Sequence, residues 1–182
     1  MAIDWTFIAT LEGAGILKGY VPVPETSNSG VTIATGVDLG QIDARELDGW
    51  PIDAALKARL KPYCGLRKFA ADDFCKANPL TITRAECEQI DGYVHPRHAR
   101  RVAALYDSKS SEPFARLPDR AQTVIVSVGF QYGDLPSRCP NFWRQCIARN
   151  WTGVIAELRT FGDAYGPRRR KEADYLAPVV AG

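Results

Sequence analysis

The sequence predicts a mostly helical fold of the α+β class, with a small N-terminal β-hairpin lobe and a cleft between this lobe and a larger helical one. Its 182 residues and 46% apolar content suit one globular domain. Residues 31–37 are rich in β-branched side chains and bounded by glycines, which predicts a strand or hairpin arm. We therefore expect a single domain over residues 1–182, with the β lobe at about 13–50 and the helical lobe at about 51–182 plus the first helix.

The first elements follow from local patterns in chain order. Residues 3–12 place their large apolar side chains on one face of a helix, and Gly13 ends this pattern. Residues 19–31 contain two prolines and end in Asn-Ser-Gly-Val, which is typical of loops. Residues 31–37 are then the only β segment that we expect.

Helical patterns fill the remainder of the chain. Thr83 followed by Glu86 is a capping-box pattern that opens a helix, which Pro96 kinks or restarts towards Tyr106. Residues 124–130 are apolar on nearly all sides and predict a central buried helix, although their β-branched content leaves a buried strand as an alternative. The other expected helices occupy residues 51–60, 66–76, 141–149, 151–159 and 168–176.

Composition narrows the functional classes. The 23 basic and 21 acidic residues leave a net charge of +2, which argues against nucleic-acid binding. No apolar run is long enough for a signal peptide or a membrane span. If the target lies outside the cytoplasm, we expect either delivery by another route or a chain that is a piece of a larger protein. The five cysteines are an odd number for a fully paired framework. We expect buried thiols with at most one or two disulfides, Cys64 and Cys75 being a candidate pair.

Two carboxylates near the N-terminus point to cleavage of a glycosidic bond. Glu12 ends the first predicted helix, and Asp38 follows the β segment. Hydrolysis of a sugar–sugar bond needs one group to protonate the leaving oxygen and another to handle the attacking water. A helix end and a nearby hairpin can supply both groups. An aspartate in this position also suits a turn in which it bonds its own backbone, and the two roles are compatible.

Three separated stretches share their order and residue types with one enzyme family. They are residues 11–13, 17–20 and 32–36, then residues 121–133 with Asn141, and lastly the Arg-rich tail at 166–176. Together they resemble the bacteriophage lysozyme family, and in particular its pesticin-like bacteriocin branch. The resemblance reaches from end to end of the chain and implies a lysozyme-like fold.

The resemblance implies a muramidase, which cleaves the β-1,4 bond between N-acetylmuramic acid and N-acetylglucosamine in peptidoglycan. Glu12 matches the general acid, and Thr32 matches the threonine that helps to hold the attacking water. Asp38, six residues after Thr32, matches the aspartate of the pesticin-like branch. Glu25 is the alternative, because it is the only acid near the position that ordinary phage enzymes use after Tyr20. Attack by water from the opposite face favours inversion at the anomeric carbon.

Further residues match supporting positions of the family. Arg169 resembles the arginine that reaches back to the catalytic glutamate, with Arg168 as the alternative. Gln131, Asn141 and Tyr20 are expected to bind the saccharide, and the first two also suit helix caps.

No cofactor or metal is expected. Cys87, His95 and His98 invite a zinc interpretation, but their spacing matches no tight zinc pattern. A serine hydrolase is also disfavoured, because the sequence contains no Gly-x-Ser-x-Gly elbow.

The pesticin-like aspartate and the missing signal favour an antibacterial toxin or effector domain that acts in the bacterial periplasm after delivery. We expect a monomer that binds a peptidoglycan glycan strand and neither nucleic acid nor membrane, with a cognate immunity protein as the partner of such an effector. Two alternatives remain open at this point: a phage endolysin, and a non-catalytic peptidoglycan-binding module that keeps the fold.

Overall fold

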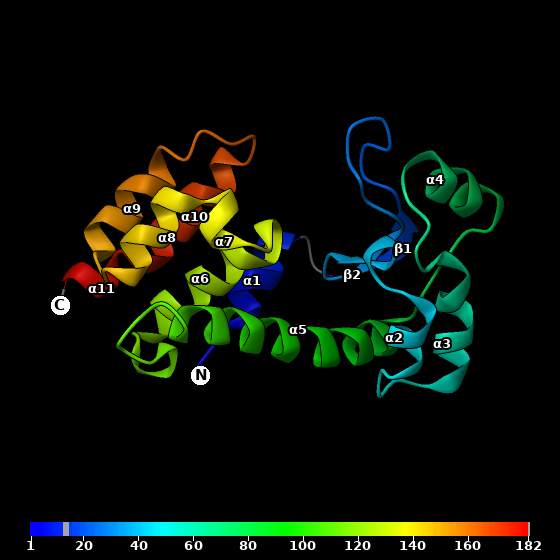
Figure 1. Cartoon of the computed structure of the whole chain (residues 1–182). Helices are drawn as coiled ribbons and strands as arrows, with labels where there is room; N and C mark the ends of the chain where they lie inside the picture. The colour runs from blue at the N-terminus through cyan, green and yellow to red at the C-terminus, as the bar shows by residue number, and fades with distance from the viewer. Residues whose placement is uncertain (13–14, 182) are drawn as a thin grey trace. The chain divides into compact units, whose positions relative to one another are not determined.

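The computed structural model describes residues 1–12 and 15–181, and it divides the chain into two compact units (Figure 1). The terminal unit combines Met1–Leu11 with Arg97–Gly182, and the central unit is Glu12–Pro96. Each unit contains its own cluster of buried apolar residues. We expected the β lobe to end near residue 50, whereas the unit that contains the sheet extends to Pro96.

The central unit contains a three-stranded antiparallel sheet in the order β1-β2-β3. Its strands are β1 (Ile16–Tyr20), β2 (Thr32–Ala34) and β3 (Val37–Asp38). The predicted hairpin at residues 31–37 is confirmed, but the prediction that it is the only β segment is wrong. β1 contains Lys18 and Gly19, which have low strand propensity. β1 nevertheless forms a strand, because its backbone hydrogen-bonds to β2 on one side and to residues 80–82 on the other.

Three short helices follow the sheet and share its core. They are α2 (Ala44–Asp48), α3 (Ala54–Leu60) and α4 (Lys68–Ala77). Leu56 and Leu60 of α3 and Ala71 of α4 are fully buried. They belong to the same cluster as Ile33 of β2 and Leu39, which follows β3. This common core explains why the central unit extends past residue 50.

The long helix α5 (Arg84–Asp107) begins in the central unit and ends in the terminal unit. Its start is the predicted capping box: the Thr83 N–H donates to Oε2 of Glu86 at 2.8 Å, and the Glu86 N–H donates to Oγ1 of Thr83 at 3.2 Å. Hydrogen bonds from Arg59 and from the Thr83 backbone lower the pKa of Glu86. The helix continues through Pro96 without a break.

The described residues of the terminal unit form helices and connecting loops, and none of them belongs to a strand. Its helices are α1 (Trp5–Glu12), α6 (Asp119–Tyr132), α7 (Leu135–Arg138), α8 (Pro140–Ile147), α9 (Trp151–Arg159), α10 (Gly166–Leu176) and α11 (Pro178–Ala181). The last residue of α1, Glu12, belongs to the central unit. Residues 121–129 of α6 are all buried, so the predicted central helix is confirmed and the strand alternative is wrong. Figure 1 shows α8, α9 and α10 gathered beside α6. Along residues 1–12 and 15–181, no helix has the length and hydropathy that crossing a bilayer requires.

All five cysteines are free thiols, and four of them are buried. The thiols of the candidate pair bond elsewhere: Cys64 Sγ donates to the Leu60 carbonyl at 3.8 Å, and Cys75 Sγ donates to the Gly19 carbonyl at 3.6 Å. The expectation of buried thiols is thus confirmed for all but Cys64, which is half-buried.

Candidate active site

The sheet places three of the predicted site residues in one row. Thr32 on β2 is the Cα partner of Tyr20 on β1 and of Asp38 on β3. Directly paired residues of antiparallel strands point to the same face of the sheet, so these side chains are neighbours. Thr32 is 7% exposed and Tyr20 is 46% exposed, so the row leads from the interior of the unit to its surface.

The Asp38 carboxylate is held by the backbone through one of its oxygens. Oδ1 accepts the N–H groups of Gly30 at 2.8 Å and Gly40 at 2.9 Å. Oδ2 accepts a longer bond, at 3.4 Å, from Nε2 of Gln41. The turn role of this aspartate is therefore confirmed. Because a carboxylate oxygen has two lone pairs, Oδ2 retains capacity to accept a further bond.

Two glycines that contact each other build this cradle. A methyl group on Gly30 would lie 2.3 Å from the Leu66 carbonyl oxygen and 2.5 Å from Cα of Gly40. A methyl group on Gly40 would meet the same carbonyl oxygen at 2.5 Å. Only glycine allows these two backbones to approach so closely that one carboxylate oxygen can bond both N–H groups.

The second threonine of the hairpin has a different partner. Thr35 lies in the turn after β2, where its N–H donates to Oδ1 of Asp91 at 3.1 Å and its hydroxyl donates to Oδ2 at 2.6 Å. Asp91 belongs to α5, so its carboxylate ties the hairpin turn to that helix. Because the Thr35 hydroxyl bonds Asp91, Thr32 is the threonine of the hairpin that lies beside Asp38.

Glu12 is the last residue of α1 and belongs to the central unit. Its Oε1 atom is shielded from solvent, as is Nε2 of His95 on α5. Burial lowers the pKa of His95, while the charges of Asp91 and Glu12 raise it in part. Glu25, the alternative acid, is exposed in the loop between β1 and β2.

Two residues of this region were not among the predicted site residues. The sequence analysis did not single out Asp91, and it considered His95 only as a metal ligand. The spacing of Cys87, Asp91 and His95, four residues apart each time, places them on one face of α5 and was the available signal. Cys87 Sγ donates to Oδ2 of Asp91 at 3.5 Å, and Nε2 of His95 lies 3.6 Å from Oδ1. In the described part of the chain, no group of these residue types has the arrangement of a metal site.

Arg169 is buried in the terminal unit, where each nitrogen of its guanidinium has an acceptor. It donates from Nε to Oδ2 of Asp163 at 2.9 Å, from Nη1 to Glu172 and from Nη2 to Gln131. The side chain also lies over the ring of Phe161, 4.8 Å from its centroid. These bonds organise α6 and α10. The role of Arg169 towards Glu12 stays a prediction.

The neighbouring basic and amide residues also have partners within the terminal unit. Arg168 donates from Nε to Oε1 of Glu172 and from Nη2 to the carbonyl and hydroxyl oxygens of Ser127, each at 3.2 Å. Gln131 uses its carbonyl oxygen for Arg169, and Asn141 is exposed on α8 with its carbonyl oxygen accepting from Arg144 at 3.0 Å. Saccharide binding by Gln131, Asn141 and Tyr20 stays a prediction.

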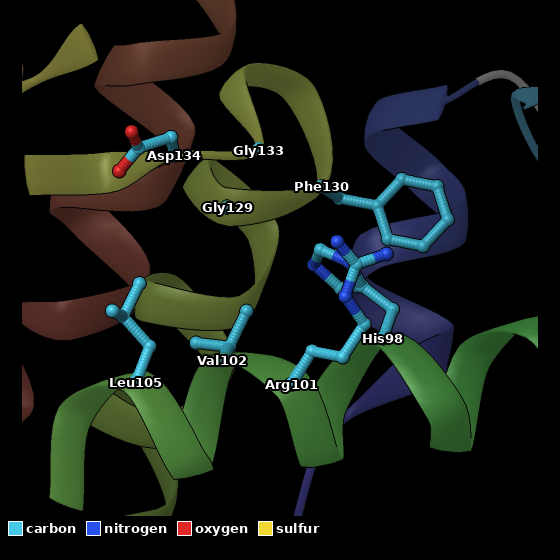
Figure 2. Close-up of a pocket in the computed structure, with 8 residues that line it drawn as sticks. All are labelled: His98, Arg101, Val102, Leu105, Gly129, Phe130, Gly133 and Asp134. Carbon is cyan, nitrogen blue, oxygen red and sulfur yellow. The ribbon is translucent and has the colours of Figure 1, made fainter. Parts of the chain in front are cut away.

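A pocket of about 380 Å³ lies between α5 and the end of α6 in the terminal unit (Figure 2). Figure 2 shows Arg101 and His98 extending from α5 towards Phe130, with Asp134 at the opposite end. The His98 ring packs edge-on against Phe130, with centroids 4.6 Å apart. The pocket thus combines a basic side, an aromatic face and a carboxylate, and none of the predicted catalytic residues lines it.

A family model described as pesticin, a bacterial toxin homologue of phage lysozyme (C-terminal part), matches residues 2–152. The chain belongs to the Pesticin family. No curated protein gives a significant match to the sequence.

Membership of the Pesticin family, the helical content and the small antiparallel sheet together establish a lysozyme-like α+β fold. The matched range includes Glu12, Thr32 and Asp38. It ends before the Arg-rich helix α10, so the Arg168 and Arg169 assignments rest on the tail alone. The sheet of this Pesticin-family chain brings together Tyr20, Thr32 and Asp38, and all three lie within the matched range.

Proposed function

We propose that the chain is a muramidase that hydrolyses the β-1,4 bond between N-acetylmuramic acid and N-acetylglucosamine in peptidoglycan. The observation that carries this proposal is the pairing of Thr32 with Asp38 across the sheet, with one oxygen of Asp38 fixed by two backbone N–H groups. A hydroxyl and a carboxylate side by side in a rigid hairpin are suited to holding one water molecule. Membership of a family homologous to phage lysozyme supports the same reaction.

In the proposed reaction, Glu12 donates its proton to the glycosidic oxygen as the bond to the anomeric carbon breaks. Asp38 accepts a proton from the attacking water through Oδ2, and the Thr32 hydroxyl orients that water. The oxygen of the water bonds to the anomeric carbon on the face opposite to the leaving sugar, which gives the inverted product.

The test is Glu12→Gln, with Glu88→Gln as the control because Glu88 is an exposed residue of α5. Loss of a general acid costs about 10²–10⁴-fold in rate. We expect Glu12→Gln to lose that much reducing-end release from purified peptidoglycan while its circular dichroism and melting temperature stay unchanged. Glu88→Gln should retain full activity. Release by Glu12→Gln at the wild-type rate contradicts the assignment.

We further propose that the domain is an antibacterial toxin that acts on the peptidoglycan of a competitor's periplasm after delivery. The family description, which names a bacterial toxin, supports this over a phage endolysin. A toxin of this kind needs an immunity protein in the producing cell, so a small neighbouring gene whose product inhibits hydrolysis is expected. A non-catalytic module is distinguished by the same release assay, because it binds peptidoglycan without producing reducing ends.

A further inference from the structure

The pocket of the terminal unit is lined by two charged side chains of opposite sign that do not pair with each other. Arg101 lies on α5, and Asp134 directly precedes α7 at the other end of the pocket (Figure 2). Within residues 1–12 and 15–181, the Arg101 side chain has neither a hydrogen bond nor an ion pair. Oδ2 of Asp134 accepts the Ser137 hydroxyl at 2.7 Å, and Oδ1 has no partner in the same described range. Both charges are therefore available to a ligand.

The surface between these two charges is apolar and closely packed. Val102 and Leu105 come from α5 and Gly129 from α6, and Figure 2 shows Val102 and Gly129 between the two charged residues. A methyl group on Gly129 would lie 3.0 Å from Cγ2 of Val102 and 3.6 Å from Cδ1 of Leu135. Contacts this close fix the two helices against each other, so the pocket is preformed. Its volume of about 380 Å³ falls in the range of about 300–1,000 Å³ that is typical of small-ligand sites.

The end of the pocket that carries Arg101 is suited to a carboxylate. A guanidinium bonds a carboxylate through two parallel N–H groups, which makes such pairs strong and directional. The neighbouring rings of His98 and Phe130 pack edge-on, and Nε2 of His98 lies 3.3 Å from the Val126 carbonyl oxygen. Basic side chains outnumber acidic ones in the terminal unit, so its field also attracts anions from a distance.

We propose that this pocket binds the peptide stem of peptidoglycan. A carboxylate of the stem bonds Arg101, the amine of its diamino residue bonds Asp134, and the apolar part between them lies on Val102 and Leu105. A ligand with only one sign of charge is repelled by one end of the pocket, whereas a peptide that carries both charges satisfies both ends. N-acetylated glycan without stems has no ammonium group for Asp134. This inference rests on the proposed muramidase function, which supplies peptidoglycan as the substrate.

The first experiment measures binding without hydrolysis. Its probe is N-acetyl-L-alanyl-γ-D-glutamyl-L-lysine, a soluble stem tripeptide whose amine is the lysine side chain. In NMR titrations, we expect Arg101→Met and Asp134→Asn each to weaken binding of the probe by about fivefold, as for a partly exposed charge pair. Arg100→Met is the matched control and should bind like wild type, because Arg100 is exposed on the same helix and does not line the pocket. Equal binding by wild type and Arg101→Met overturns the proposal, as does a wild type that does not bind the probe.

The same tripeptide with its lysine amine acetylated tests the role of Asp134. Wild type should bind the acetylated peptide about fivefold less tightly than the parent, because the ammonium charge is gone. Asp134→Asn should bind the two peptides with nearly equal affinity, and Arg101→Met should still weaken binding of the acetylated one. Acetylation that has no effect on wild type, or an equal effect on Asp134→Asn, overturns the proposal.

A hydrolysis assay then separates the pocket from the catalytic proposal. Arg101→Met should raise KM for intact peptidoglycan severalfold and leave kcat unchanged, because the lost bond is made equally in the ground state and the transition state. Glycan strands from which an amidase has removed the stems should be hydrolysed alike by Arg101→Met and wild type. Arg101-dependent binding of the tripeptide by a chain without hydrolytic activity supports the pocket and contradicts only the muramidase proposal. Hydrolysis in which neither KM nor tripeptide binding depends on Arg101 overturns only the pocket.

Discussion

The two oxygens of Asp38 have different environments, and this difference shapes what a substitution at this residue does. Oδ1 satisfies the N–H groups of Gly30 and Gly40, whereas Oδ2 receives only a long bond from Gln41. Oδ1 therefore has the structural role, and Oδ2 has the proposed catalytic role. An amide in place of the carboxylate can keep the hydrogen bonds of Oδ1 but cannot act as a base at the position of Oδ2.

Asp38→Asn should therefore separate activity from stability. Its carbonyl oxygen can still accept both glycine N–H groups, so we expect a melting temperature close to that of wild type. Reducing-end release should fall by about 10²-fold or more, because an amide cannot take a proton from water. Asp38→Ala should lose the activity and also about 1–3 kcal/mol of the free energy of unfolding, because it leaves the N–H groups unsatisfied. Equal stability of the two variants contradicts this division.

At the scale of elements, the hairpin and the segments that hold it depend on the close contact between Gly30 and Gly40. This contact joins the loop that leads into β2 to the turn after β3, and the Leu66 carbonyl lies against both glycines. Bulk added here must displace backbone, which is less adaptable than a side chain.

We expect Gly30→Ala to lower the free energy of unfolding by about 3 kcal/mol or more, since overpacking alone costs about 1–3 kcal/mol and the Asp38 bonds are also lost. Denaturant unfolding measures the loss. Gly92→Ala is the matched control, because a methyl group at Gly92 on α5 meets no atom within 4 Å. The control should be neutral or stabilising, as helical Gly→Ala changes generally are. A stable, active Gly30→Ala contradicts the importance of the contact.

Elements with strong local signals were predictable from the sequence, and elements made by tertiary pairing were not. The capping box of Thr83 and Glu86 fixed the start of α5 correctly, because its hydrogen bonds are local. β1 escaped prediction because its pairing with β2 and residues 80–82 overrides weak propensity. Within the site, Asp38 was predicted from its position after the β segment and from the family resemblance, and Thr32 from the resemblance alone. The bond from Thr35 to Asp91 spans 56 residues, and no local pattern encodes it.

At the scale of the whole molecule, the chain has two buried clusters, one in each unit, and a buried ionic network supports one of them. Arg169 and Glu172 are fully buried in the terminal unit, and Asp163, which also bonds Arg169, is partly buried. Burial raises the pKa of Asp163, but hydrogen bonds from Tyr132 and Arg169 outweigh burial and hold the pKa below its ordinary value. The stabilisation from Asp163 is therefore present above its unfolded pKa of about 3.9 and is lost as the pH falls through the lower folded value.

Arg169→Met should lower the free energy of unfolding by about 3 kcal/mol, because it breaks a buried ion pair and leaves Oε2 of Glu172 without its donor, while Arg168 still bonds Oε1. Arg170→Met, at the exposed neighbouring position, is the matched control and should change stability little. Hydrogen exchange should show the loss of protection first in α6 and α10. Unchanged protection of these helices in Arg169→Met contradicts the role of the network.

The free thiols bear on how the domain survives an oxidising environment. Burial is the main cause that raises the pKa of Cys64, Cys87 and Cys139 to about 11 and the pKa of Cys146 well above its ordinary value. At neutral pH a thiol with such a pKa is only about one part in 10⁴ thiolate, and the thiolate is the species that attacks disulfides. The folded domain therefore resists mixed-disulfide formation at these four positions.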